Sequence, residues 1–240
     1  MPRVVKPEDH AVKRSEILDA AEHLIYTKGY EQMTVQDLID TLKISKGAFY
    51  HYFRSKQEVL EGLVDRLQAD LDRVLEPVVN DTGLTALEKL QAFFNVMGQW
   101  KTDQQPVLRS MLRMLRPDEN ALYIQKVRLA RFHKFSEMLT VILQQGIREG
   151  VITTASPEDL SQIVVSLIQA LNTALAMQLF TAESSEDLFA RMSQTIAVYK
   201  EATERVLGLK QDTLFFADDD VLRRWVVPLK DMEDTSQEPT

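Results

Sequence analysis

Residues 34–60 read TVQDLIDTLKISKGAFYHYFRSKQEVL and contain the clearest helix-start signals of the chain. Thr34 lies three residues before Asp37, the spacing of a capping box with Asp in place of Glu. Ser45 is a good N-cap for a second helix, which begins two or three residues after the first one ends. The stretch therefore predicts two short helices joined by a tight turn.

Helices are predicted on both sides of this pair. Apolar residues recur at helical spacing from Ser15 onward, and Gly29 ends that run as a C-terminal cap would. Ser55 and Glu58 form an S-x-x-E box that opens a long helix reaching Pro77. The leucines of this helix are in register at 60, 63, 67 and 71, followed by Val74. Three short helices thus lead into one long helix.

The rest of the chain also has helical periodicity, so the fold class is all-α with about nine helices. A helix capped by Thr85 and Glu88 is followed by a short segment from Pro106 to Arg116. Long helices are expected at 118–148, at 157–180 after its cap Ser156, and after a cap at Ser185, ending at Gly208. Residues 209–240 are acidic, and we expect a partly ordered tail.

Composition excludes several classes of protein. The 240 residues are 45% apolar and 27% charged, which is typical of a globular chain, and they include no cysteine, so disulfides, thiol nucleophiles and cysteine zinc sites are excluded. The first residues lack the apolar run of a secretory signal, so we expect a cytoplasmic protein outside the membrane. The four histidines are scattered and no catalytic or phosphate-loop motif occurs, which predicts no enzyme, no cofactor and no metal.

Three short helices of which the last two form a tight pair are the plan of a helix-turn-helix domain, whose second helix enters the DNA major groove. The N-terminus of that helix suits a phosphate, and Tyr50 and His51 lie one turn further along, while Phe49 and Phe53 face the core. Basic and hydroxyl groups on neighbouring helices are placed to contact phosphates. The predicted DNA-binding residues are Lys13, Arg14, Thr34, Ser45, Lys46, Gly47, Tyr50, His51 and Lys56.

The stretch S-K-G-x-x-Y-H-Y-F-x-x-K resembles the signature of the tetracycline-repressor-like (TetR) family of bacterial transcription regulators. The resemblance covers residues 13–62 by motif and the rest by helix count. Lys43 departs from it, because a lysine stands where the family usually has the turn glycine. The resemblance implies a homodimer on an inverted-repeat operator, as a nucleoid-associated repressor, with a C-terminal domain that binds a small molecule and releases the DNA.

The predicted domains are residues 1–54 for DNA binding, 55–208 for ligand binding and dimerisation, and 209–240 for the tail. The helix at 157–180 has little polar face, and a chain of this size can cover it internally or with a second copy. We expect the second copy, on the last two long helices. The predicted interface residues are Leu160, Val164, Leu167, Leu171, Met192, Ile196 and Tyr199.

An apolar, aromatic or acyl-type effector is expected from the aromatic and methionine side chains of the larger domain, although such residues are more often plain core. Asn172 stands in an apolar stretch, where a buried amide needs a partner: an effector, a second copy or backbone. The predicted pocket residues are Phe93, Met97, Trp100, Met111, Phe132, Phe135 and Asn172.

Three alternatives stay open. Residues 101–134 carry eight basic and three acidic groups, which form either a solvated face or a site for an anionic ligand. Asp218–Asp220 lack the ligand spacing of a calcium loop, so the metal interpretation is the weaker one. The rival function is an all-α dimeric interaction or ligand-binding protein without DNA-binding activity.

Overall fold

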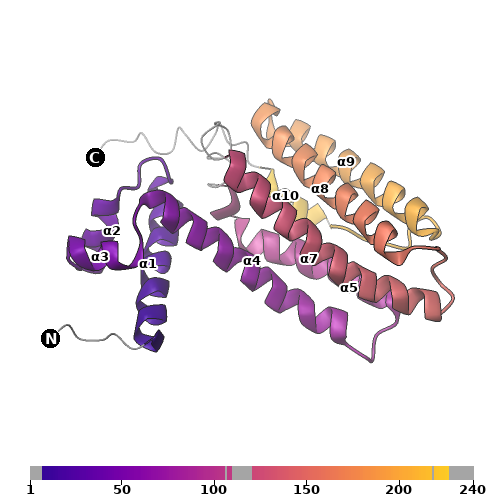
Figure 1. Ribbon diagram of the computed structural model, residues 1–240. Coiled ribbons are helices and arrows are strands. Elements are labelled where there is room, and N and C mark those ends of the chain that lie inside the picture. Colours follow the sequence, from indigo (N-terminus) through magenta and orange to yellow (C-terminus); the bar gives the residue numbers. More distant parts are fainter. Residues whose placement is uncertain (1–6, 106, 110–120, 218, 227–240) are drawn as a thin grey trace. The chain divides into compact units, whose positions relative to one another are not determined.

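The computed structural model describes residues 7–105, 107–109, 121–217 and 219–226, and every described element is a helix (Figure 1). The chain divides into two compact units, residues 1–70 with 106–117 and residues 71–105 with 118–240, here called the N-terminal and C-terminal units. The predicted all-α class is confirmed. The domain limits predicted at 54/55 and 208/209 stay a prediction.

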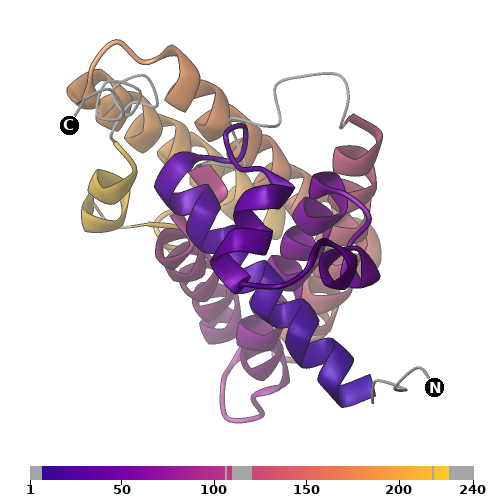
Figure 2. The same ribbon diagram turned by 90° about the vertical axis from the view of Figure 1, so that its left-hand side faces the viewer.

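The N-terminal unit is built on α1 (Pro7–Lys28), α2 (Val35–Leu42) and α3 (Lys46–Tyr52), drawn in indigo and violet in Figure 2. The helix start predicted at Ser15 is wrong, because α1 begins eight residues earlier at Pro7. Pro7 and the acidic residues that follow it suit the first turn of a helix, and the prediction overlooked this signal. The side chains that hold the three helices together are fully or almost fully buried: Ile17, Ala21, Ile25, Met33, Leu38, Phe49 and Phe53.

Helix α4 (Lys56–Asn80) is longer than predicted, since it continues three residues past Pro77. Proline lacks an N–H and removes a hydrogen bond, but near the last turn this loss is small enough for the helix to continue. The predicted leucine register holds to Leu71, whereas Val74 is 37% exposed and Leu75 takes the buried position. The shift follows from the 3.6-residue repeat, which drifts away from a strict spacing of seven.

The C-terminal unit contains α5 (Ala86–Asp103), α7 (Ala121–Arg148), α8 (Pro157–Thr181), α9 (Ser185–Leu207) and α10 (Asp219–Trp225). Helices α7, α8 and α9 pack side by side in chain order, joined by short loops (Figure 1). The predicted caps at Thr85 and Ser156 are confirmed, and α9 takes Ser184 as its cap, one residue before the predicted Ser185. The segment predicted from Pro106 to Arg116 and the helix start at Asp118 lie largely outside the described residues.

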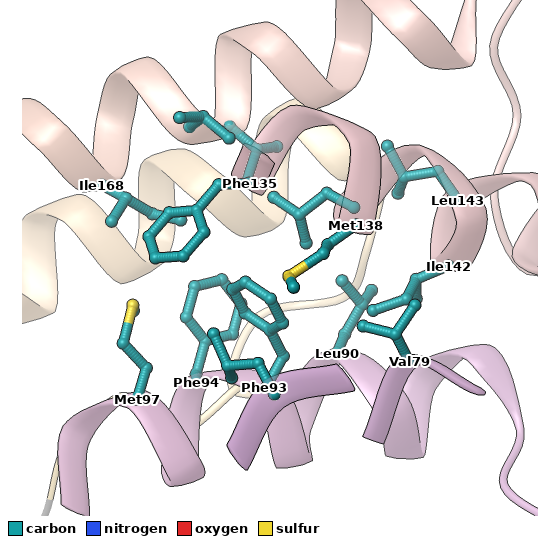
Figure 3. Close-up of a cluster of buried hydrophobic side chains, with 14 of the residues drawn as sticks. Val79, Leu90, Phe93, Phe94, Met97, Phe135, Met138, Ile142, Leu143 and Ile168 are labelled. Carbon is teal, nitrogen blue, oxygen red and sulfur yellow. The ribbon is translucent and has the colours of Figure 1, made fainter. Parts of the chain in front are cut away.

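One aromatic and aliphatic cluster forms the core of the C-terminal unit (Figure 3). Phe93 meets Phe135 edge to face, with ring centroids 5.7 Å apart. Phe94 stacks on Phe216 at 4.4 Å, so the acidic segment after α9 contributes to the same core. Buried Glu204 fixes that segment by accepting the backbone N–H of Leu214 at 2.8 Å.

Helix α8 is the one helix in the described part of the chain that is long and apolar enough to cross a membrane by length and composition. Only 28% of the most apolar 18-residue stretch of α8 is buried inside the chain. The large apolar side chains that α8 leaves exposed are Ile163 and Met177.

Candidate nucleic-acid interface

The α2–α3 pair is fixed by local capping. The N–H of Ala48 donates to Ser45 Oγ at 3.1 Å at the start of α3. Between the helices Lys43 adopts the left-handed conformation with φ 52° and ψ 42°, and its N–H donates to the carbonyl of Asp40. A lysine therefore makes the turn that glycine usually makes, at a cost of about 1 kcal/mol.

The two faces of α3 differ completely in exposure. Phe49 and Phe53 have no exposed surface, whereas Tyr50 is 45% exposed. Ser45, Lys46, Gly47 and His51 are exposed as well. The helix thus presents one hydroxyl, one ammonium, one phenol and one imidazole outward, and no carboxylate lies within it. This arrangement suits a polyanion with hydrogen-bonding groups, which is the chemistry of a DNA groove.

Two of the predicted phosphate contacts are held against the protein. The Arg14 guanidinium lies 4.7 Å from the centroid of the Phe53 ring. Lys56 Nζ donates to the carbonyl of Glu31 at 3.1 Å and lies 4.1 Å from the Tyr30 ring centroid. Burial lowers the pKa of Lys56, and burial also raises the pKa of Tyr30 to about 12. Both cations therefore stabilise the N-terminal unit in addition to any contact they make with DNA.

The other two predicted phosphate contacts, Lys13 and Thr34, lie on the surface. Lys13 pairs with Glu16 one turn later on α1, and each side chain is about two-fifths exposed. Thr34 is exposed and caps α2. An exposed ion pair of this kind is weak, so Lys13 is able to exchange Glu16 for a phosphate.

The sequence analysis missed His10. Its ring centroid lies 4.7 Å from that of Tyr52 and 5.5 Å from that of His51, which places the start of α1 against the last turn of α3. No spacing rule links residues 10 and 51, and the predicted helix start at Ser15 left His10 outside any element. Only the fold brings these rings together.

The predicted pocket residues do not share one environment. Phe93, Met97 and Phe135 are buried in the core cluster, and Trp100 and Phe132 pack against it. Met111 lies outside the described residues. The expectation of a buried amide at Asn172 is wrong: the residue is exposed, and its Oδ1 accepts a hydrogen bond from Lys101 Nζ at 2.8 Å. The partner is thus a lysine side chain, which is none of the three partners predicted.

The predicted interface residues differ in exposure within the single chain, and their role in a dimer stays a prediction. Leu160, Val164, Leu171 and Met192 are buried within the single chain, because they face the neighbouring helices. Leu167, Ile196 and Tyr199 are half-buried. The large apolar side chains that α8 and α9 leave exposed are instead Ile163, Met177, Val198 and Val206.

Among the described residues there is no group of three or more His, Asp or Glu side chains placed to hold a metal ion, and Asp218 lies outside them.

The helix-turn-helix geometry, with an outward polar face on its second helix, defines a DNA-binding regulator of transcription. Residues 17–63 match the profile described as bacterial regulatory proteins, tetR family, so this part of the chain is similar to the helix-turn-helix domain of that family. The match covers the helix-turn-helix region and the beginning of α4.

Two relatives and one solved structure extend the comparison. The uncharacterized HTH-type transcriptional regulator YfiR of Bacillus subtilis is 27% identical over 172 residues, which are 65% of this chain and 75% of the relative. The HTH-type transcriptional repressor KstR2 of Mycolicibacterium smegmatis is 34% identical over 92 residues, 37% of this chain and 42% of the relative. The chain therefore spans less than half the length of that repressor. The structure of a SmeT–triclosan complex superposes with a TM-score of 0.61 at 18% identity, over 86% of this chain and 98% of the other, and so shares the fold.

Proposed function

We propose that this regulator is a repressor that binds an inverted-repeat operator as a homodimer and is released by a small apolar, aromatic or acyl-type molecule. The observation that carries the proposal is the outward face of α3, where Lys46, Tyr50 and His51 are all exposed while Phe49 anchors the helix in the core. Repression is the activity named for the KstR2 relative.

The DNA-reading step rests on α3. Lys46, Tyr50 and His51 face the bases and phosphates of the major groove. Ser45 and Gly47 lie at the N-terminus of the helix, where free N–H groups favour a phosphate oxygen. Gly47 leaves open space, since a Cβ there would meet only Ser45 Oγ at 4.0 Å. A DNA backbone is thus able to approach the helix closely at this residue.

The dimer rests on the uncovered apolar faces of α8 and α9. Ile163 is 49% exposed and Met177 59% on α8, and Val198 is 57% exposed on α9. A two-fold related copy buries the same face on both chains, which makes this the simplest way to cover it. In such a dimer the two copies of α3 bind half-sites about 34–36 Å apart, one turn of DNA.

The response to an effector is proposed to travel along α4. Its first part makes ion pairs with α1, where Arg66 pairs with Asp19 and Glu22. Its second half pairs with α7, because Asp72 Oδ1 lies 2.5 Å from a guanidinium nitrogen of Arg131. An effector that favours one tilt of α4 changes DNA affinity by its coupling energy, typically about 1–3 kcal/mol, which gives about 5- to 150-fold induction. Triclosan in the SmeT complex is a precedent for a small aromatic ligand in this fold.

The test starts from DNA selection. Genomic fragments that the purified full chain retains should share an inverted repeat, and a nuclease footprint should cover both half-sites. The rival interaction protein is excluded if the logarithm of the binding constant falls steeply with the logarithm of salt concentration, because this slope counts displaced phosphate counterions. A slope near zero and no enriched fragment would overturn the proposal.

We expect the protein in the cytoplasm, associated with the nucleoid, and without catalytic turnover.

A further inference from the structure

The hydrogen bond between Lys101 and Asn172 joins α5 to α8 at the C-terminal part of α5. Lys101 Nζ donates to Asn172 Oδ1 at 2.8 Å, so an ammonium ion is paired with a neutral amide. Burial lowers the pKa of Lys101 to about 8. Asp103, the nearest carboxylate in the sequence, lies about 200° away around the helix and accepts from Gln99 Nε2 at 2.7 Å. The charge of Lys101 is therefore not neutralised by the acid closest to it.

Lys101 and Asn172 lie next to the apolar core of the C-terminal unit, each one helical turn after a buried core residue. Met97 lies one turn before Lys101 on α5, and Ile168 lies one turn before Asn172 on α8, so each polar residue shares a helix face with a buried one. Figure 3 shows the side chains of Met97, Phe135 and Ile168 gathered at one end of the cluster. The Lys101–Asn172 pair thus lies at the end of an aromatic and aliphatic cluster, which is a suitable place for the head of an amphiphilic molecule.

Two cations of α7 are already paired with carboxylates. Arg131 pairs with Asp72 at 2.5 Å, and its guanidinium lies 4.9 Å from the Phe135 ring centroid. Lys134 pairs with Glu76 at 3.1 Å. These two members of the basic stretch 101–134 are held by carboxylates of α4, whereas Lys101 faces an amide. Lys101 is therefore a better candidate for an anionic ligand than Arg131 or Lys134.

The pair offers hydrogen-bond donors in one place. Because Asn172 Oδ1 accepts from Lys101, its amide nitrogen is left with two N–H donors, and the ammonium has two further N–H groups. Among the described residues no acceptor takes these hydrogens. A carboxylate has acceptor sites for both donors, and a charge-assisted hydrogen bond to it is about twice as strong as a neutral one.

We propose that Lys101 and Asn172 form a carboxylate-recognition site and that the effector is an apolar monocarboxylate whose body lies against Trp100 and Phe132, the partly buried side chains that pack against the core. This inference rests on the proposed function, since it names the class of the effector. The carboxylate accepts hydrogen bonds from Nζ of Lys101 and from the amide of Asn172.

The experiment is calorimetric titration of the full chain with decanoate and 4-phenylbutyrate, each compared with its uncharged methyl ester, in the absence of DNA. We expect at least one acid to bind at least tenfold more tightly than its ester at pH 7, and this preference to decline above about pH 8 as the ammonium loses its proton. Lys101→Met should remove the preference and retain ester binding. Lys101→Arg should keep it, and Lys210→Met, which removes an exposed lysine of the same unit, should bind like the wild type.

Two outcomes would overturn the site. One is an undiminished preference for the acid in Lys101→Met, with helicity unchanged. The other is a wild-type protein that binds neither acid more tightly than its ester. The titration contains no DNA, so it measures carboxylate binding independently of operator binding. A protein that binds no operator would contradict the proposed function, but it would not change the result of this titration.

Discussion

Asp37 accepts two hydrogen bonds from Thr34, one from its backbone N–H and one from its hydroxyl, both at 2.6 Å. In return the N–H of Asp37 donates to Thr34 Oγ1 at 3.1 Å. Lys28 at the end of α1 also pairs with Asp37, with Nζ 2.5 Å from Oδ2. The same carboxylate thus caps α2 and ties it to α1, so it helps to set where α2 begins.

The first prediction concerns acid stability. Hydrogen bonds from Lys28 and Thr34 lower the pKa of Asp37 to about 2. A lowered carboxyl pKa contributes stability above the unfolded value of about 4, and this contribution is lost as the pH falls toward about 2. Thr34→Ala should lower the free energy of unfolding by about 1 kcal/mol, because the helix cap is lost. Thr34→Ser should retain most of the stability that the cap contributes. Urea unfolding at pH 7, 4 and 2.5 measures both effects. Asp37→Asn should lose less unfolding free energy than the wild type between pH 7 and 2.5, and equal losses would contradict the role of Asp37.

The second prediction separates DNA contact from folding at Gly47. Alanine is favoured over glycine in a helix by about 0.5–1 kcal/mol, and a Cβ at Gly47 meets no atom closer than 4.0 Å. Gly47→Ala should therefore raise the melting temperature slightly. It should also weaken operator binding, because the methyl group occupies the space through which the DNA backbone approaches. Melting curves and a binding isotherm on the selected operator test both parts, and unchanged affinity would contradict the proposed approach.

The third prediction concerns packing between α7 and its neighbours. A Cβ at Gly146 would lie 2.6 Å from Cγ1 of Ile152 and 3.3 Å from Cβ of Ala86. Both neighbours are buried, so Gly146→Ala forces them apart and should destabilise the chain by about 1–3 kcal/mol. The control is Gly98→Ala on α5, whose nearest atom is the Phe216 carbonyl oxygen at 3.5 Å, an ordinary contact. Denaturant midpoints that do not distinguish the two variants would refute this packing.

The fourth prediction tests the dimer face. Ile163→Glu or Val198→Glu places a charge on a side chain that is about half exposed in the single chain, so the monomer should fold. In a dimer the same charge is buried without a partner, and dissociation should follow. Val141→Glu on α7, whose side chain is 46% exposed, is the matched control and should remain dimeric. Light scattering after gel filtration gives the mass; dimers that persist in both α8 and α9 variants would place the interface elsewhere.

The elements predicted well are those with local signals. Thr34, Ser45, Thr85 and Ser156 cap helices as their sequence neighbours indicate, because an N-cap depends only on residues within one turn. The box predicted at Ser55 forms only in part: Ser55 Oγ accepts from the N–H of Glu58, but Glu58 accepts from the N–H of Arg54.

Features that depend on the fold were missed. His10 contacts His51 only because the fold brings the start of α1 against α3, and Asn172 accepts from Lys101 only because α5 and α8 contribute to the same core cluster. The apolar pattern of α8 also predicts burial without saying which residues face the chain and which face a partner. Val164 is 1% exposed and its neighbour Ile163 is 49% exposed, a difference set by packing against α7.

The salt dependence of operator binding in four variants tests whether the exposed face of α3 reads DNA. Lys46→Ala and Tyr50→Ala alter that face, while Lys210→Ala and Tyr26→Ala remove exposed side chains elsewhere. If α3 reads DNA, the two α3 variants should lose at least tenfold in affinity with helicity unchanged. Lys46→Ala should also lower the magnitude of the salt slope by about 1, and both controls should match the wild type. Equal affinity and equal slope in all four variants would contradict this role of α3.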